Sequence, residues 1–253
     1  MSSILRCTDP EDALSSVSAL YGVPSRELEH ALPNALARAE ADPEDPVGGL
    51  AAALGAELRR TPQTPSAIHY FHGTRARELG SFACDGLRPL GQMLEPLWRE
   101  IGELVPELSE RELRSLRADL SAGAIAPHTY SCRVADSGQH GPCGHLLRDV
   151  LLHPQAYNSV DYLAGAEIVM DICQAIEDRA GINATERYRK ATTPCVVEFS
   201  APTTRLRHAL CAALWYLGAG LADRRTMNAN WGYGGDGTPL PAERIVSVLG
   251  LEE

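Results

Sequence analysis

The sequence predicts an α+β protein, and two observations support this fold class. Expected strands and helices are mixed along the 253 residues without regular strand–helix–strand alternation or an internal repeat. No phosphate loop or dinucleotide fingerprint is present, since the glycine-rich run GYGGDG at 232–237 lacks a strand before it and a helix after it. Ordinary Rossmann and P-loop architectures are therefore not expected.

Composition and charge indicate which partners and which compartment to expect. The chain carries 23 Lys and Arg against 33 Asp and Glu, a net charge of −10, so a nucleic acid is not expected as the main partner without a local basic patch. No run approaches the roughly 18 apolar residues of a membrane helix, and the N-terminus lacks the pattern of a secretory signal. We therefore expect a cytoplasmic protein without a membrane partner, whose seven scattered cysteines are reduced thiols.

Residues 1–63 are predicted to form a helical N-terminal region that ends in a linker. Asp9 and Ser25 are candidate N-caps for two helices, because their side chains can accept a hydrogen bond from the first helical turn. A third apolar stripe follows at 45–60, and the run TPQTPS then reads as a linker. Residues 64–253 are expected to form a second, larger domain.

The second domain is predicted to begin with a strand that ends at Gly73 and Thr74. A helix closing on Gly86 should follow, and Ser109 to Glu112 supplies a capping box for a later helix. The remaining elements, in chain order, are expected as a strand at 125–136, helices at 141–154 and 160–181, a buried strand at 193–202, a helix at 205–222, and a glycine-rich loop, a turn and a last strand within 232–251.

The segment 68–90 resembles the first motif of the ADP-ribosyltransferase fold, in the branch shared by diphtheria-toxin-like enzymes and poly(ADP-ribose) polymerases. That motif is a strand ending in His-Gly-Ser/Thr, here His72-Gly73-Thr74, followed by a helix ending in Gly-Leu-Arg, here Gly86-Leu87-Arg88. The resemblance covers about 20 of the 253 residues. It implies a split β-sheet core with helical insertions and NAD as co-substrate.

The resemblance also implies roles for the residues of this motif. His72 would bond a ribose hydroxyl of NAD, Gly73 would offer its backbone N–H and C=O to the carboxamide, and Thr74 would add a hydroxyl to the same amide. Arg88, which closes the motif, is grouped with them as cofactor-binding. The alternative for His72 is an ordinary histidine at a strand end.

The family's second motif is a strand-borne tyrosine that stacks on the nicotinamide ring. Tyr130 is the candidate because it lies on the next expected strand, and an aromatic face suits a flat ring that becomes a leaving group. An ordinary cross-strand tyrosine is the alternative for it. Tyr162 is the second candidate, although it falls in an expected helix.

The family's third motif is a late-strand glutamate that stabilises the positive charge developing on the ribose. Glu198 lies in the middle of the strand CVVEF, where the flanking apolar residues allow a solvent-facing carboxylate, although this strand comes early in the chain for the role. The segment 227–241 before the last strand departs from the family pattern, because it contains no glutamate and offers Asp236 instead. Glu198 and Asp236 are therefore the two candidates for the catalytic carboxylate, and Tyr130 is counted both as a catalytic and as a cofactor-binding residue. Polymerase activity is in doubt.

Cys132, His140, Cys143 and His145 are all zinc-ligand types, but their spacing matches none of the established finger patterns, so we expect no metal. The sequence thus predicts a mono-ADP-ribosyltransferase, a glycosyltransferase that cleaves the nicotinamide–ribose bond of NAD and passes ADP-ribose to an acceptor. A protein acceptor is expected ahead of a nucleic acid, and a toxin, effector, defence or housekeeping role is left open. One alternative is an inactive module that binds NAD or ADP-ribose. The other is a relative of tRNA 2′-phosphotransferase, which would bind a phosphate through Arg75, Arg77 and Arg88.

Overall fold

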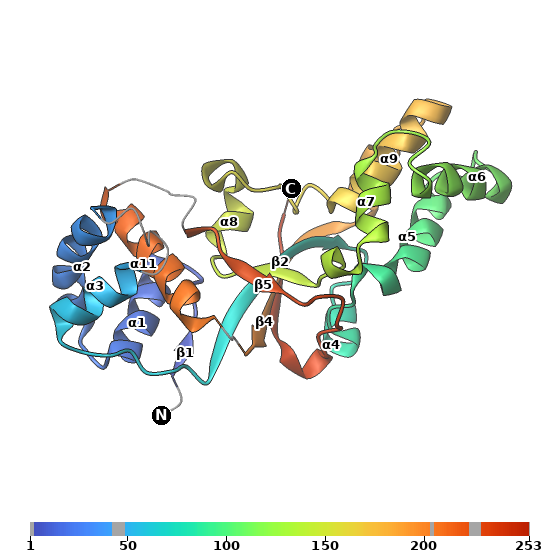
Figure 1. Cartoon of the computed structure of the whole chain (residues 1–253). Coiled ribbons are helices and arrows are strands. Elements are labelled where there is room, and N and C mark those ends of the chain that lie inside the picture. The colour runs from blue at the N-terminus through green and yellow to red at the C-terminus, as the bar shows by residue number, and fades with distance from the viewer. Residues whose placement is uncertain (1–2, 42–48, 203–204, 223–228, 253) are drawn as a thin grey trace. The chain divides into compact units, whose positions relative to one another are not determined.

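The computed structural model describes residues 3–41, 49–202, 205–222 and 229–252. Helices and strands are mixed in this part of the chain, as the α+β prediction requires, and six strands form one open sheet (Figure 1). Among the described helices, none is long and apolar enough to span a bilayer.

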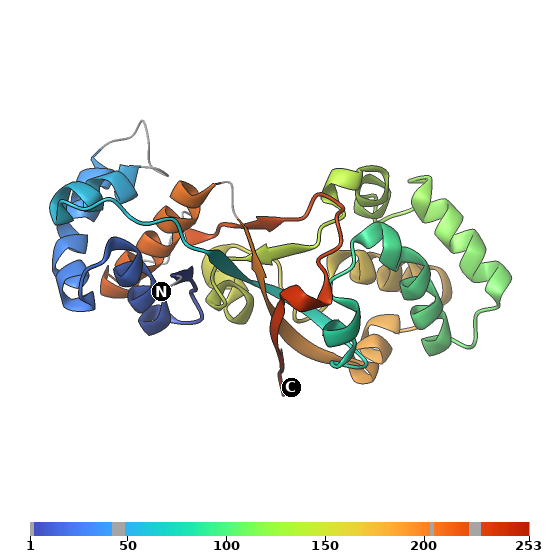
Figure 2. The same ribbon diagram turned by 90° about the horizontal axis from the view of Figure 1, so that it is seen from below.

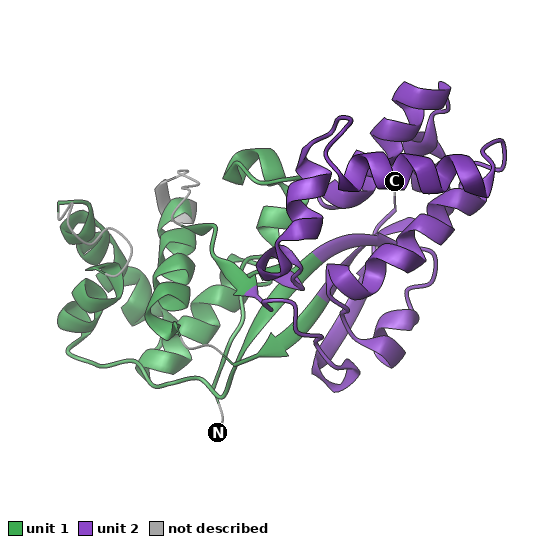
Figure 3. Cartoon of the chain, turned by 45° about the vertical axis from the view of Figure 1, so that its right-hand side comes forward, with its two compact units in different colours: residues 1–72, 144–160, 198–233 green, residues 73–143, 161–197, 234–253 purple. Residues whose placement is uncertain are grey.

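The chain divides into two compact units (Figure 3). Unit 1 contains residues 1–72, 144–160 and 198–233, and unit 2 contains the rest. The division passes through strands β2 (Ala67–Ala76) and β4 (Thr193–Ala201). It does not follow the boundary at residue 63 that the linker predicts, because segments from the middle and the end of the chain pack with the N-terminal helices.

The sheet is built around β2, the longest strand. Its strand order is β5-β3-β2-β4-β6, and β1 pairs with β2 outside this path. β1 runs parallel to β2 with Ile4 opposite Ala67, whereas β3 runs antiparallel with Phe71 opposite His145. The strands besides β2 and β4 are β1 (Ile4–Leu5), β3 (Cys143–His145), β5 (Gly232–Gly234) and β6 (Ile245–Gly250).

Unit 1 contains a cluster of four helices, in which α11 packs against α1, α2 and α3 (Figures 1 and 2). Asp9 caps α1 as predicted, since its carboxylate accepts a hydrogen bond from the backbone N–H of Asp12. Ser25 was expected to be a cap but is the first helical residue of α2, after Pro24. The helices of unit 1 are α1 (Pro10–Tyr21), α2 (Ser25–Glu40), α3 (Gly49–Leu58), α8 (Asp149–Leu152) and α11 (Leu206–Ala222), with the 3-10 turn Pro154–Tyr157.

Unit 2 has its own hydrophobic core, formed where α5, α6, α7, α9 and α10 meet. Ser109 and Glu112 form the predicted capping box at the start of α6, and Gly181 ends α9 in the left-handed conformation. The helices are α4 (Ser81–Asp85), α5 (Leu90–Leu104), α6 (Glu110–Ser121), α7 (Thr129–Ala135), α9 (Glu167–Ala180) and α10 (Ala184–Ala191), with 3-10 turns at Ser137–Gln139 and Ala242–Arg244.

Three predictions of secondary structure are wrong. The helix expected at 141–154 contains strand β3 (Cys143–His145), and only Asp149–Leu152 within it is α-helical. The expected strand at 125–136 contains helix α7, because Tyr130 and Val134 are four residues apart and both face the core of the unit from one side of a helix. The helix expected from residue 160 begins only at Glu167, and the residues around Tyr162 form a turn before it.

Candidate functional site

The motif His72-Gly73-Thr74 lies in the second half of β2. Gly73 is buried, whereas His72 and Thr74 are half-buried. Because successive side chains of a strand point to opposite faces, His72 and Thr74 share one face of the sheet. The motif therefore presents two polar side chains on that face and a bare backbone between them.

Gly73 lies beside Cys143 in unit 2. Phe71 pairs with His145, and partner numbers run in opposite directions in an antiparallel pair, so the register places Gly73 opposite Cys143. No side chain on Gly73 covers the backbone at this point. In the strand order β2 has β3 on one side and β4 on the other, so Gly73 is an interior residue of the sheet.

Asp236 lies close to Cys143 as well. Gly235 donates its N–H to Pro142 O at 2.9 Å, and Gly237 donates to Gly141 O at 2.8 Å, so the turn that carries Asp236 is held against residues 141–143. Asp236 itself has φ of 48°, a left-handed conformation that aspartate tolerates. Burial raises the pKa of the Cys143 thiol, and the charge of Asp236 raises it further.

Tyr162 lies in the turn before α9, also in unit 2. Its hydroxyl is hydrogen-bonded to Glu167, and burial, Glu167 and Cys143 all raise its pKa. Glu167, the first residue of α9, is itself held by both terminal nitrogens of Arg133, with Nη1 at 2.7 Å from Oε2. The two hydrogen bonds from Arg133 hold the carboxylate of Glu167 in place, and that carboxylate in turn holds the hydroxyl of Tyr162.

Tyr130 has no place in this group. Its side chain is 1% exposed, its ring meets Trp98 edge to face, and its hydroxyl accepts a hydrogen bond from Trp98 Nε1 at 2.8 Å. It is a core residue of unit 2 rather than a tyrosine on a strand. The prediction that placed it on the strand after the motif is corrected by helix α7.

Glu198 is buried, although its apolar neighbours in the sequence allowed a solvent-facing carboxylate. Its Oε1 lies 2.7 Å from His69 Nδ1 and 2.8 Å from Arg6 Nε, and the residue is 5% exposed. His69 and His72 are three residues apart on one strand and therefore point to opposite faces of the sheet. The structure thus does not bring Glu198 to His72.

The face that His72 occupies carries an aromatic cluster in unit 1. Tyr70 lies two residues before His72, and its ring centre is 5.4 Å from that of Tyr233 and 5.7 Å from that of Phe199. Gly144 leaves room for these rings, since a Cβ there would lie 2.7 Å from the Phe199 ring. Trp231 completes the cluster at 6.0 Å from Tyr70.

Sequence reasoning missed this aromatic cluster. The signal that could have found it is period-two spacing, Tyr70-x-His72 on one strand and Trp231-x-Tyr233 on another. The glycines on both sides of Tyr233 instead favour a loop, which is what the sequence predicts for this segment.

At the end of the motif, the backbone of Gly86 packs closely against the backbone of residues 240–242. Gly86 has φ of 69°, and a Cβ there would lie 2.0 Å from Leu240 O, so only glycine fits. Leu87 forms a bridge with Leu240. Arg88 forms an exposed ion pair with Asp85 at 3.1 Å, so its side chain is engaged within unit 2.

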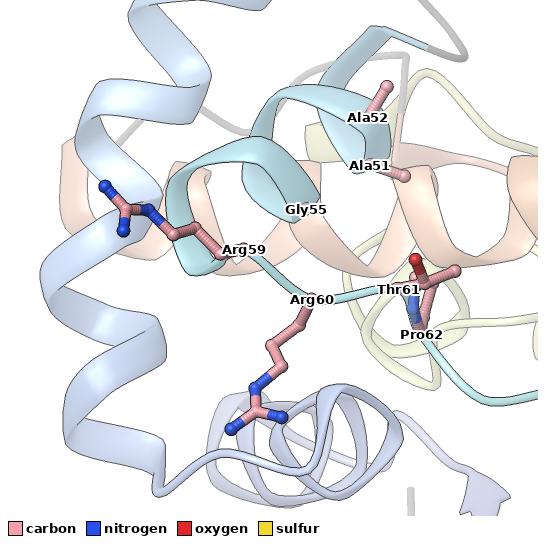
Figure 4. Close-up of a pocket in the computed structure, with 7 residues that line it drawn as sticks. All are labelled: Ala51, Ala52, Gly55, Arg59, Arg60, Thr61 and Pro62. Atoms are coloured by element: carbon pink, nitrogen blue, oxygen red, sulfur yellow. The ribbon is translucent and has the colours of Figure 1, made fainter.

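Metal-ligand clusters and surface pockets are two further kinds of candidate site. Among the residues that the structure describes, no three His, Cys, Asp or Glu side chains are placed to hold a metal ion. A pocket of about 340 Å³ follows α3, with Arg59 and Arg60 on its wall. The two arginine side chains point in different directions (Figure 4), and none of the predicted site residues lines this pocket.

Comparison with protein-family models, curated proteins and solved structures gives no match to this chain. The chemistry of the site is therefore argued from its own residues. Those residues are a bare backbone at Gly73, a thiol at Cys143, a fixed phenol at Tyr162 and a carboxylate at Asp236.

The neighbourhood of Cys143 and Asp236 can be tested by thiol alkylation. In Asp236→Asn we expect iodoacetamide to modify Cys143 about two- to fivefold faster at pH 8, because loss of the negative charge lowers the pKa of the thiol and raises its thiolate fraction. Peptide mass spectrometry gives the rate at each cysteine. Cys84, which is exposed, is the internal reference and should react unchanged; an unchanged rate at Cys143 would contradict the proximity.

Proposed function

We propose that this chain binds NAD at the end of β2 and transfers its ADP-ribose to an acceptor, as a mono-ADP-ribosyltransferase with the split-sheet fold of that family. One observation carries the proposal: Gly73 of the His-Gly-Thr motif lies opposite Cys143, and the turn that contains Asp236 is hydrogen-bonded to Gly141 and Pro142 just before that cysteine. The backbone pairing thus brings a carboxylate-bearing turn near the motif, although the two come from separate segments of the chain.

The residues present suit the steps of this reaction. The imidazole of His72 can bond a ribose hydroxyl, and the backbone of Gly73 can pair with the carboxamide. Tyr162 replaces Tyr130 as the aromatic residue proposed to hold the nicotinamide ring, because Glu167 and Arg133 fix its hydroxyl. Asp236 is the carboxylate proposed to stabilise the positive charge that develops on the ribose.

In the proposed transfer, the bond from the ribose carbon to nicotinamide is replaced by a bond to the acceptor. The bond between the ribose and nicotinamide breaks, and its electron pair leaves with neutral nicotinamide. The acceptor nucleophile then forms a bond to the same ribose carbon and loses a proton to solvent. Water must be excluded in favour of the acceptor, so acceptor orientation decides between transfer and hydrolysis.

The second candidate is a module that binds NAD or ADP-ribose without turnover. It is favoured by the position of Glu198, which is paired with Arg6 and His69 on the face opposite His72. The phosphotransferase alternative loses support, because the three arginines on which it depends are engaged by the protein. Their partners are backbone carbonyls and Thr192 for Arg75, Glu100 and Glu103 for Arg77, and Asp85 for Arg88.

The deciding experiment is incubation with NAD that carries a labelled adenylate. A transferase releases nicotinamide and leaves label on one acceptor class when protein, DNA and RNA are offered separately. Binding of NAD without nicotinamide release would support the module instead. Absence of NAD binding, measured by calorimetry, would refute both candidates.

His72→Ala is expected to weaken NAD binding about tenfold or more, the usual effect of removing one hydrogen bond to a ligand. The variant should keep its fold and lose less than about 1.5 kcal/mol of stability, because His72 is half-buried and not part of a core. Calorimetry measures the affinity and thermal unfolding the stability. His30→Ala, on an exposed position of α2, is the matched control; equal affinities in the two variants would remove His72 from the site.

A further inference from the structure

The aromatic cluster of unit 1 has a buried side and a half-exposed side. Its rings belong to Tyr70, Phe199, Trp231 and Tyr233. Tyr70 and Phe199 are fully buried, whereas Trp231 and Tyr233 are half-buried and keep part of their surface in contact with solvent. Aromatic rings are large apolar groups whose faces stack on other flat rings. The half-exposed side thus offers a surface on which a flat ligand can stack.

The ring of Tyr233 is held at a fixed angle by its two buried neighbours. Its centre lies 5.4 Å from that of Tyr70, with 43° between the ring planes, and 5.4 Å from that of Phe199, with 73° between the planes. The ring of Trp231 lies against Tyr70 at 6.0 Å and 42°. A ring that is already fixed loses little freedom when a ligand stacks on it, so this surface is preorganised for binding.

The aromatic cluster extends to His72. Because Phe71 pairs with His145 in antiparallel register, Gly144 lies opposite His72, and directly opposite residues point to the same face of the sheet. The side chain of Phe199 comes from β4 and covers Gly144, since a Cβ on Gly144 would lie 2.7 Å from its ring. In the sheet β2 lies between β4 and β3, so this ring lies across β2 on the face that His72 occupies. His72 and the four rings all belong to unit 1.

We propose that the half-exposed rings of Tyr233 and Trp231 bind the adenine base of NAD by stacking. This inference rests on the proposed function, which assigns a ribose hydroxyl to His72 and the carboxamide to the backbone of Gly73. NAD carries two flat rings, joined through two riboses and a pyrophosphate. Gly73 follows His72 along β2, whereas Tyr70 and its cluster precede it. Nicotinamide is therefore placed on the Gly73 side of His72, and adenine is the ring that remains for the cluster.

The two halves of NAD make it possible to test this assignment on the intact chain. AMP carries the adenine but no nicotinamide, and nicotinamide mononucleotide carries the nicotinamide but no adenine. Tyr233→Leu is expected to weaken the binding of AMP and of NAD about tenfold, the usual effect of removing one base–aromatic stack. The affinity for nicotinamide mononucleotide should stay unchanged. Calorimetry measures all three affinities.

Two variants and a fluorescence signal separate stacking from a change in the fold. Tyr233→Phe keeps the ring and should keep the AMP affinity, and Phe82→Leu, at a half-buried position of α4 outside the cluster, is the matched control. Circular dichroism and thermal unfolding show whether each variant is folded. AMP should also quench the fluorescence of Trp231, and Trp231→Phe should remove this quenching while most of the AMP affinity remains, because Trp98 and Trp215 are buried elsewhere.

Three outcomes would overturn the adenine assignment. They are a protein that does not bind AMP, equal AMP affinities in the wild type and folded Tyr233→Leu, and a loss that appears with nicotinamide mononucleotide instead of AMP. Any of these can occur while NAD is still turned over, and the proposed transferase would then stand without this inference. Conversely, NAD binding without nicotinamide release, together with the expected AMP result, would refute the transferase and leave the adenine site in place.

Discussion

Asp236→Asn is expected to lower the rate of nicotinamide release about 10²–10³-fold while the affinity for NAD changes little. A carboxylate that faces a developing positive charge interacts more strongly with the transition state than with ground-state NAD, so its loss lowers turnover rather than binding. Asparagine also tolerates the left-handed conformation that Asp236 adopts at φ of 48°, so the turn should be kept. Nicotinamide release under saturating NAD gives the rate, and calorimetry gives the affinity.

The control for this prediction is Asp178→Asn, which removes a carboxylate at an exposed position of α9 and should leave the rate unchanged. Glu198→Gln should likewise leave the rate per folded molecule unchanged, because Glu198 faces away from His72. A rate unaffected by Asp236→Asn would exclude Asp236 as the catalytic carboxylate. A parallel loss of rate and affinity would instead assign it to NAD binding.

Glu198→Gln is expected to destabilise the fold by about 2–3 kcal/mol. The carboxylate of Glu198 accepts hydrogen bonds from Arg6 and meets His69 on a buried face of the sheet, and removing one partner of a buried pair leaves the others without compensation. The effect is placed below the usual range for fully buried pairs because the Arg6 side chain is 41% exposed, and solvent screens its charge. Urea denaturation measures the difference in the free energy of unfolding.

Glu29→Gln serves as the matched control, because Glu29 lies on the exposed side of α2, and should change stability by less than about 0.5 kcal/mol. Arg6→Ala should destabilise as well, since it removes the partner that reaches Glu198 from the residue just after β1. If Glu198→Gln were as stable as the wild type, the three side chains would contribute no net stability as a group.

Local patterns predicted most of the elements. The capping box at Ser109, the cap at Asp9 and the terminal Gly181 are short-range devices, and each is found where the sequence places it. The strands that contain His72 and Glu198 were also predicted, because runs rich in β-branched and aromatic residues favour strands. Tyr130 was misplaced because apolar residues within ten positions fit a strand and a short helix almost equally well.

The pairing of distant segments could not be predicted in the same way. Arg6 and Glu198 are 192 residues apart, and nothing in either local sequence indicates the other. The turn beside Cys143 illustrates the same limit, because Asp236 comes from a loop more than 90 residues further along the chain. The His-Gly-Thr motif indicated where a site begins, but strand register and loop packing decide which residues complete it.

The packing of α11 has a practical consequence for anyone who shortens this chain. The linker at 61–66 looks like a natural place to start a smaller protein, yet α11, near the other end of the chain, rests on α1 and α3. A protein beginning at residue 64 would expose buried residues of α11 such as Leu210 and Leu214, and would also lose Arg6. Such an exposed apolar helix binds chaperones and promotes aggregation. Assays of this protein should therefore retain its first 63 residues.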